Sequence, residues 1–364
     1  MEILNLQPEA FGLDISSRSL KVAQLEKRGT FSTELTLKGY NEVEVPENTI
    51  QKTIVTDQDA LYEAIKKGWE GAEEIDTNFV TASLPEEKAF LEIIQMPKIS
   101  KEEIKKSVKY EAENYIPMSM DEVYFDSEII TPIENSLDHT DVLIVAFPKR
   151  VVDPYVSCIK NAGLKPVALE IESQSIARSL IKNYFSRKPL LLIDLGATRT
   201  TIMVYSGKTL RFTAYIPISS QQFTRIISDQ LGVDWGKAEQ LKINEGLGEA
   251  GKSEEISEAL TPILTDLKEQ ISNHLEYYET HSFHEHLPSG GGKINKIILT
   301  GGGSNLSGLP EFLSSQLGIS AELGNPWINI LGEDLKQIPK MSFEESTKYT
   351  VALGLALRSF MNND

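Results

Sequence analysis

Two stretches of the chain share one pattern of apolar and polar positions. Residues 190–201 read Leu-Leu-Leu-Ile-Asp-Leu-Gly-Ala-Thr-Arg-Thr-Thr, and residues 11–20 read Phe-Gly-Leu-Asp-Ile-Ser-Ser-Arg-Ser-Leu. Each predicts a buried strand with one carboxylate at its tip, Asp14 or Asp194, followed by a tight polar turn and a second strand. Because these two aspartates occupy equivalent points 180 residues apart, the pattern indicates two related halves.

The two predicted turns are suited to binding phosphate. A tight turn between buried strands directs several backbone N–H groups into one small space, and Gly196 allows the reversal. A carboxylate beside such a turn is suited to holding Mg²⁺, usually through water. The alternative interpretation of either stretch is an ordinary hairpin with a polar turn residue.

A glycine-rich turn follows in the last quarter of the chain. Residues 297–308 read Ile-Ile-Leu-Thr-Gly-Gly-Gly-Ser-Asn-Leu-Ser-Gly, and Leu309-Pro310 begins a predicted helix. Three consecutive glycines, Gly301 to Gly303, remove every Cβ from this turn. A flat ligand can therefore lie against the backbone at the helix N-terminus.

Up to residue 164 the pattern predicts sheet elements and then a compact helix–strand–strand–helix unit. Asp57 is the expected N-cap of one helix, Ser100 with Glu103 forms the capping box of another, and Asp153-Pro154 starts a third. The predicted elements are strands within 11–45, a helix over 57–69, strands over 79–84 and 89–95, a helix over 100–117, strands over 123–130 and 142–147, and a helix over 153–163.

Beyond residue 164 the pattern is mainly helical, apart from the second hairpin and the strand before the glycine turn. The predicted elements are a strand over 167–170 and helices over 173–184, 222–231, 235–242, 253–260, 262–280, 310–317 and 350–360. An apolar stripe along 262–280 indicates core packing. The last helix is expected to cross back to the first half of the molecule.

Charge and composition exclude several classes of protein. Lys and Arg number 36 against 53 Asp and Glu, a net charge of −17, which argues against binding nucleic acid or docking on anionic lipid by charge. No signal peptide pattern and no apolar run of membrane-spanning length are found in the sequence. A single cysteine, Cys158, excludes an internal disulfide framework. The composition therefore predicts a cytoplasmic protein.

The three motifs, in this order, resemble the phosphate-binding hairpins and adenosine-binding turn of the actin-like ATPase superfamily. Further stretches resemble the PilM family of type IV pilus assembly, above all Tyr-Glu-Ala-Glu-Asn-Tyr-Ile-Pro at 110–117, and also 145–149, 162–167, 238–242, 324–327 and 352–356. The resemblance covers nearly the whole chain. It implies an α/β, actin-like ATPase (ribonuclease H-like) fold of two duplicated lobes with an FtsA-type inserted small α+β domain.

The same resemblance implies a division of the chain into domains. The first lobe (1A) is expected to take residues 1–94 and to be completed by 165–187 and 340–364, with the inserted small domain (1C) at 95–164. The second lobe (2A) takes 188–243 and 294–339, and a helical subdomain (2B) takes 244–293. Family-specific partners are expected near the inserted domain.

The resemblance further implies that a cleft between the lobes binds ATP and Mg²⁺. Asp14 and Asp194 are the expected metal ligands and, with Glu172 and Gln174, the expected catalytic residues. The expected cofactor-binding residues are Ser16, Ser17, Ser19, Lys21, Gly196, Ala197, Thr198, Thr200, Glu239, Lys242, Gly301, Gly302, Gly303, Ser304 and Asn305. From the residues alone, Glu172 and Gln174 fit a helix cap or a solvent-facing surface as well as catalysis, and Glu239 and Lys242 fit two ordinary charges on an exposed helix.

The sequence departs from the family pattern at two places. Ser16 follows the first Asp-Ile where relatives often have Gly, and Ser219-Ser220 replaces a usual Gly-Gly. A side chain at position 16 stands where the backbone normally approaches phosphate, which predicts weaker binding or slower turnover. ATP binding is therefore predicted, and hydrolysis is left open.

The function that the resemblance implies is a cytoplasmic, ATP-binding component of type IV pilus assembly. ATP closure of the lobes is expected to favour binding of the N-terminal tail of a PilN-like inner-membrane protein, through which the protein associates with the membrane. Pilus motor ATPases and other copies of the chain are further expected partners. The alternatives are an FtsA-like cell-division filament protein and a metabolic kinase of the same superfold.

Overall fold

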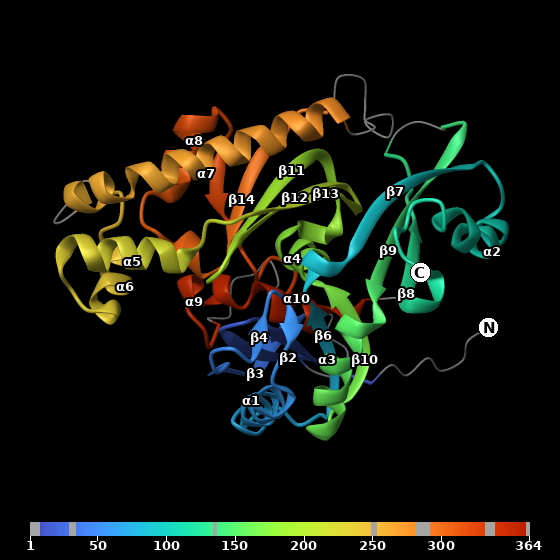
Figure 1. Cartoon of the computed structure of the whole chain (residues 1–364), viewed down its shortest axis with the longest axis horizontal. Coiled ribbons are helices and arrows are strands. Elements are labelled where there is room, and N and C mark those ends of the chain that lie inside the picture. Colours follow the sequence, from blue (N-terminus) through green and yellow to red (C-terminus); the bar gives the residue numbers. More distant parts are fainter. Residues whose placement is uncertain are drawn as a thin grey trace.

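The computed structural model of the chain describes residues 8–28, 34–133, 137–248, 253–281, 292–331 and 339–361. Two five-stranded sheets form the centres of two lobes, and a three-stranded sheet extends from the first lobe (Figure 1). We call them the first, second and small sheets. A small hairpin of two short strands, β4 (Ile50–Gln51) and β5 (Ile54–Val55), precedes the first helix in the chain.

The two large sheets have the same topology. In each, three antiparallel strands form one side of the sheet, and two strands that run parallel to the first of these three form the other side. Written in the same direction, the orders are β3-β2-β1-β6-β10 and β13-β12-β11-β14-β15. This equivalence confirms the predicted duplication. The strands of the first sheet are β1 (Phe11–Ile15), β2 (Ser19–Lys27), β3 (Leu35–Glu44), β6 (Phe79–Leu84) and β10 (Lys165–Ile171). Those of the second are β11 (Ser186–Leu195), β12 (Thr200–Gly207), β13 (Thr209–Ile216), β14 (Lys296–Thr300) and β15 (Ala321–Leu323).

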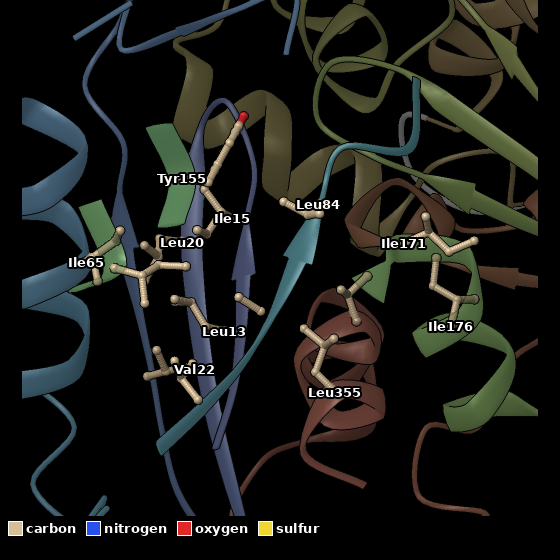
Figure 2. Close-up of a cluster of buried hydrophobic side chains, with 14 of the residues drawn as sticks. Leu13, Ile15, Leu20, Val22, Ile65, Leu84, Tyr155, Ile171, Ile176 and Leu355 are labelled. Carbon is tan, nitrogen blue, oxygen red and sulfur yellow. The ribbon is translucent and has the colours of Figure 1, made fainter. Parts of the chain in front are cut away.

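Helices from distant parts of the chain cover the first sheet. They are α1 (Gln58–Glu70), capped by Asp57 as predicted, α3 (Lys149–Asn161), α4 (Glu172–Leu180) and α10 (Thr350–Leu357). Figure 2 shows Leu355 of α10 between strand side chains of the first sheet and Ile171 and Ile176. The last helix therefore returns to the first lobe, as predicted.

Two glycines allow α10 to lie this close to its neighbours. A Cβ at Gly12 of β1 would overlap the carbonyl oxygen of Ala352, and a Cβ at Gly354 of α10 would overlap the carbonyl oxygen of Ser175 in α4. Backbone therefore packs directly on backbone across β1, α10 and α4. Any larger residue at either position would push α10 away from the sheet.

The second sheet is covered by α5 (Ser220–Leu231), α6 (Trp235–Asn244), α7 (Ser253–His281) and α8 (Leu309–Leu317). The prediction of separate helices over 253–260 and 262–280 was wrong, because α7 is continuous and includes Pro262. The buried apolar stripe runs at helical spacing on both sides of this proline. Packing of the stripe on the second sheet outweighs the single N–H that Pro262 lacks.

The small sheet has the order β7-β9-β8 and carries one helix. Its strands are β7 (Phe90–Pro97), β8 (Val123–Ile129) and β9 (His139–Pro148), and its helix is α2 (Lys101–Ala112), which begins at the predicted capping box of Ser100 and Glu103. Along β9, Val142, Ile144 and Ala146 pack with α2 in one apolar cluster. Leu143, Val145 and Phe147 alternate with them and line a groove toward the first lobe.

Helix α3 begins earlier than its sequence suggested. It starts at Lys149, directly after β9, so Asp153-Pro154 lies inside the helix instead of at its start. Tyr155, Cys158 and Ile159 of α3 belong to the core of the first lobe. The predicted boundary of the inserted domain at residue 164 stays a prediction, and this packing favours a boundary before α3.

Two smaller features complete the described chain. Helix α4 ends at Leu180 and not at Tyr184, because the backbone of Ile181 is extended, and the positive φ angles of Asn183 and Tyr184 keep the helix from resuming. Helix α9 (Phe343–Lys348) precedes α10 and lies beside the glycine-rich turn. Within the residues described above, no helix is both long and apolar enough to span a membrane.

Candidate functional site

The tips of the two predicted hairpins and the glycine-rich turn line one cleft between the lobes, with a volume of about 280 Å³. We call it the hairpin cleft. Eleven of the predicted site residues line it: Asp14, Ser16, Ser19, Lys21, Glu172, Asp194, Gly196, Ala197, Glu239, Gly301 and Gly302. These residues come from β1, β2, α4, β11, α6 and the turn after β14. The fold therefore gathers residues that are far apart in the sequence.

Asp14 lies at the end of β1 and is held within the first lobe. Its side chain is buried, and Ser83 Oγ on the neighbouring strand donates to Asp14 Oδ1 at 3.2 Å while accepting from the Ile15 N–H at 3.0 Å. Burial raises the pKa of Asp14, and the charge of Lys21 partly opposes this effect. Lys21 Nζ donates to Ser19 Oγ at 2.6 Å and lies 3.4 Å from a carboxylate oxygen of Glu42.

Ser16 uses its hydroxyl to close its own turn. The backbone N–H and Oγ of Ser16 both donate to the carbonyl oxygen of Ser19, at 3.0 and 2.8 Å. Ser16 Oγ also accepts from the Ser19 N–H at 3.2 Å. The hydroxyl that we expected to obstruct the phosphate approach is thus engaged inside the hairpin. Its effect on binding remains a prediction.

Asp194 occupies the equivalent position at the end of β11. Burial and the nearby charge of Asp14 raise its pKa to about 6, because two ionised carboxylates facing one another in a buried site repel. The turn behind it is closed by the Gly196 N–H, which donates to the Arg199 carbonyl at 2.9 Å. The first turn of α5 lies against this hairpin, since the Ser220 N–H donates to the Gly196 carbonyl at 3.0 Å.

Arg199 connects the second hairpin to the first lobe. Its guanidinium donates to Glu172 at 3.0 Å and to Glu87 at 3.1 Å, and it lies over the ring of Tyr215, 5.2 Å from the ring centre. Burial and the carboxylates of Asp14, Asp194 and Glu86 raise the pKa of Glu172 to about 8, although Arg199 opposes this. Sequence reasoning missed Arg199, although it stands inside the quoted motif, because its partners lie in distant segments.

The glycine-rich turn requires its glycines for contact with the second hairpin. Gly301 has a φ of +81°, and a Cβ there would overlap the carboxylate of Asp194. A Cβ at Gly303 would lie 2.9 Å from the side chains of Leu195 and Ser220. Ser304 and Asn305 stabilise the turn: Ser304 Oγ donates to the Gly301 carbonyl, and Asn305 Nδ2 donates to the Glu344 carbonyl and to Thr347 Oγ1.

The other eight predicted residues do not line the cleft, and three of them, Gly303, Ser304 and Asn305, belong to the glycine-rich turn just described. Lys242 is fully buried and donates to Ser220 Oγ, Thr224 Oγ1 and Glu239 Oε2 at 2.7, 3.0 and 2.7 Å, so it supports Glu239 instead of facing a ligand. Thr200 Oγ1 donates to the Ile218 carbonyl at 2.7 Å. Ser17 and Thr198 line a cavity on the other side of the hairpins, and Gln174 lines the groove described next.

A groove of about 410 Å³ runs between the small sheet and the first lobe, and we call it the edge groove. Strands β8 and β10, each at an edge of its sheet, line it. Its apolar lining residues include Leu143, Val145, Val152, Val156 and Leu169, and its acidic ones are Asp126, Glu128 and Glu170. Burial and the charge of Asp126 raise the pKa of Glu128. An apolar floor between two free strand edges suits an extended peptide.

Comparison with solved structures identifies the class of this fold. The MreB 5 protein of Spiroplasma citri bound to AMPPNP aligns with a TM-score of 0.53 at 12% identity, covering 94% of this chain and 93% of that one. The PilM–PilN type IV pilus biogenesis complex contains a chain that aligns with a TM-score of 0.77 at 25% identity, covering 98% and 99% of the two chains. The fold is that of the actin-like ATPases.

A match to a family model identifies the protein family within this fold class. The model for the type IV pilus assembly protein PilM matches residues 12–360, and the chain belongs to that family. Cell division protein FtsA of Enterococcus hirae is 26% identical over 201 residues, covering 50% of this chain and 44% of FtsA. FtsA of Streptococcus pneumoniae is 24% identical over 357 residues, covering 86% and 75%. The chain spans less than half the length of the first of these two relatives.

Proposed function

We propose that the hairpin cleft binds Mg·ATP. The observation that carries this proposal is the convergence of two hairpin carboxylates and the glycine-rich turn on one cleft. Burial raises the pKa values of Asp14 and Asp194, so a divalent cation bound between the two carboxylates would favour their ionised forms. Two carboxylates cannot surround Mg²⁺, so water and phosphate oxygens would complete its shell. MreB 5, of the same fold class, is bound to AMPPNP.

Different residues of the cleft would bind different parts of the nucleotide. Lys21 would face the phosphates, and backbone N–H groups of the two turns would lie beside them. Glu239, held by Lys242, is placed to accept hydrogen bonds from the ribose. Bound Mg²⁺ would supply charge neutralisation for phosphoryl transfer. With its pKa raised to about 8, Glu172 is mostly protonated at neutral pH, so only a minor fraction is available as the carboxylate that could accept a proton from water.

We further propose that the edge groove binds the N-terminal tail of a PilN-like membrane protein in an extended conformation. A chain similar to this one is part of a PilM–PilN complex. Either free edge, β8 or β10, can pair with an added strand, and apolar side chains of the tail would cover the groove floor. A basic residue of the tail would offset Asp126 and Glu128.

Helix α4 connects the two proposed sites. Glu172 at its first position lines the hairpin cleft, and Gln174 two residues later lines the edge groove. A movement of the second hairpin on nucleotide binding would reach α4 through the contact between Arg199 and Glu172. The protein would thus couple nucleotide state to tail binding, as a pilus assembly component attached to the membrane through its partner.

Calorimetric titration tests both sites together. The purified chain is titrated with the N-terminal peptide of a PilN-like protein from the same genome, with Mg·ATP and without nucleotide. We expect tighter peptide binding with Mg·ATP. Absence of peptide binding in both states would reject the pilus function and favour an FtsA-like filament, for which the FtsA relatives are the supporting observation.

Two exposed tyrosines of the small sheet and its helix provide a matched pair of variants. Tyr124, 49% exposed, lines the edge groove, whereas Tyr110 on α2 is 74% exposed and does not line it. We expect Tyr124→Ala to weaken peptide binding by about tenfold, as for an aromatic interface anchor. Tyr110→Ala should leave it unchanged. Equal effects of both variants would place the peptide elsewhere.

A further inference from the structure

Trp235 is a partly exposed aromatic residue that lines the hairpin cleft. It is the first residue of α6, 46% exposed, and the only aromatic side chain among the described residues that line the hairpin cleft. The other two tryptophans contribute to structure: Trp327 is buried, and Trp69 donates to the Thr77 carbonyl at 3.2 Å. Trp235 therefore needs a separate explanation.

Packing of α6 does not explain Trp235. The residues that attach α6 to the second lobe are Ala238, Leu241 and Lys242, all of which are buried. Asp234 caps the helix by accepting from the Lys237 N–H at 3.0 Å, which needs no particular side chain at position 235. With 46% of its surface exposed, Trp235 leaves part of its indole open to the cleft.

Trp235 lines the hairpin cleft from α6, together with Glu239. Glu239 follows Trp235 by one helical turn, so both side chains project from the same side of α6 into the cleft. Lys348 of α9 lines the cleft near the glycine turn, since a Cβ at Gly302 would lie 3.5 Å from Lys348 Cγ. With the phosphates at Asp14, Lys21 and Asp194, the base of a nucleotide would lie among these groups.

We infer that Trp235 stacks on the base of the bound nucleotide and favours purine over pyrimidine nucleotides. This inference rests on the proposed nucleotide binding. A purine covers more of the indole than a pyrimidine and removes more apolar surface from water. The stem of Lys348 and the backbone at Gly302, which line the same cleft, would provide the facing wall.

Nucleotide titrations of the full chain test this role. Mg·ATP and Mg·CTP affinities are measured by calorimetry for the native chain, Trp235→Ala, Trp235→Phe and the control Trp69→Phe. We expect Trp235→Ala to weaken Mg·ATP binding by about tenfold, in line with the effect of removing one base-stacking aromatic. Trp235→Phe should retain most of the affinity, and the preference for ATP over CTP should fall in Trp235→Ala.

Two further readouts separate stacking from a merely structural role. Mg-tripolyphosphate lacks a base, so its affinity should be the same in the native chain and Trp235→Ala. Mg·ATP should change the intrinsic fluorescence of the native chain and of Trp69→Phe, but not of Trp235→Ala. Unchanged ATP affinity and an unchanged ATP-to-CTP ratio in Trp235→Ala would overturn the inference alone. Failure of the native chain to bind Mg·ATP would overturn the proposed function and this inference with it.

Discussion

The two hairpins share topology and differ in what holds them. The hairpin of Asp14 is supported within its own lobe, by Ser83, by the Ser16–Ser19 turn and by Lys21 with Glu42. The hairpin of Asp194 is tied to the other lobe, because Arg199 reaches Glu172 and Glu87. Duplication produced two similar turns, and among the contacts of the described residues named here it is the second turn that reaches the opposite lobe.

The largest expected effect comes from removing either hairpin carboxylate. Asp14→Asn and Asp194→Asn should each weaken Mg·ATP binding by about 100-fold, which corresponds to about 2.7 kcal/mol, because each removes half of the negative charge that faces the metal. The melting temperature without nucleotide should not fall at pH 8, since a buried carboxylate with a raised pKa disfavours the folded state when ionised. Calorimetry and thermal unfolding measure the two effects. Unchanged affinity in Asp194→Asn would mean that the cleft is not the Mg·ATP site.

Arginine substitutions in the two hairpins sharpen the comparison directly. Arg199→Gln removes the contacts to the first lobe, whereas Arg18→Gln removes an ion pair with Glu47 that stays within the first lobe. We expect Arg199→Gln to abolish the enhancement of peptide binding by Mg·ATP, a coupling that typically amounts to about 5- to 150-fold. Peptide affinity without nucleotide should not change.

The control for this prediction is Arg18→Gln, which should keep the enhancement. Calorimetric titration of both variants with the PilN-like peptide, with and without Mg·ATP, decides the question. If both variants lose the enhancement equally, the contact across the lobes has no special role and coupling takes another route.

The pH dependence of binding reports on the second hairpin. Because the pKa of Asp194 is raised to about 6, Asp194 gains a proton as the pH falls through 6 and then no longer attracts Mg²⁺. We expect Mg·ATP affinity to fall by about tenfold from pH 7 to pH 5, one factor of ten per pH unit below the pKa.

Asp194→Asn serves as the reference, since it retains any titration of ATP itself. Its affinity should vary less with pH than that of the native chain. Parallel pH profiles for the two proteins would assign the dependence to the nucleotide and not to Asp194.

The smallest expected effect concerns the turn of the first hairpin. Ser16→Gly removes the hydroxyl that bonds Ser19 and should destabilise the chain by about 0.5–1 kcal/mol, measured by chemical unfolding. Because this hydroxyl is engaged in the turn, Mg·ATP affinity should change less than about twofold, within 0.4 kcal/mol. A tenfold gain in affinity would show that the side chain does obstruct the phosphate.

Local patterns predicted the parts of the molecule whose causes are local. The hairpins of Asp14 and Asp194, the N-cap at Asp57 and the capping box at Ser100 depend on residues a few positions apart, and the structure has all of them. The continuity of α7 and the start of α3 depend on surfaces that these helices pack against. Local rules for proline therefore gave wrong boundaries at Pro154 and Pro262.

The residues of the candidate site also separate into those that local patterns predicted and those that depend on distant contacts. Motif residues at the cleft, such as Asp14 and Gly301, follow strands whose pattern is visible in the sequence. Arg199 contacts Glu172 and Glu87, which are 27 and 112 residues away in sequence, and a single chain does not reveal such contacts. Trp235 and Lys348 line the cleft outside the motifs that the sequence analysis singled out. The burial of Lys242 was missed for the opposite reason, because a lysine in a helix is normally exposed.

Close packing of α10 against β1 and α4 also has a consequence for biosynthesis. The chain emerges from the ribosome N-terminus first, so the strands of the first sheet are complete long before residues 350–357 are made. Until then, the apolar surface that α10 covers is open to water, and the space beside Gly12 is unfilled. The first lobe can reach its native core only after the second has been synthesised, so a ribosome that stalls before residue 350 would release a chain prone to aggregation.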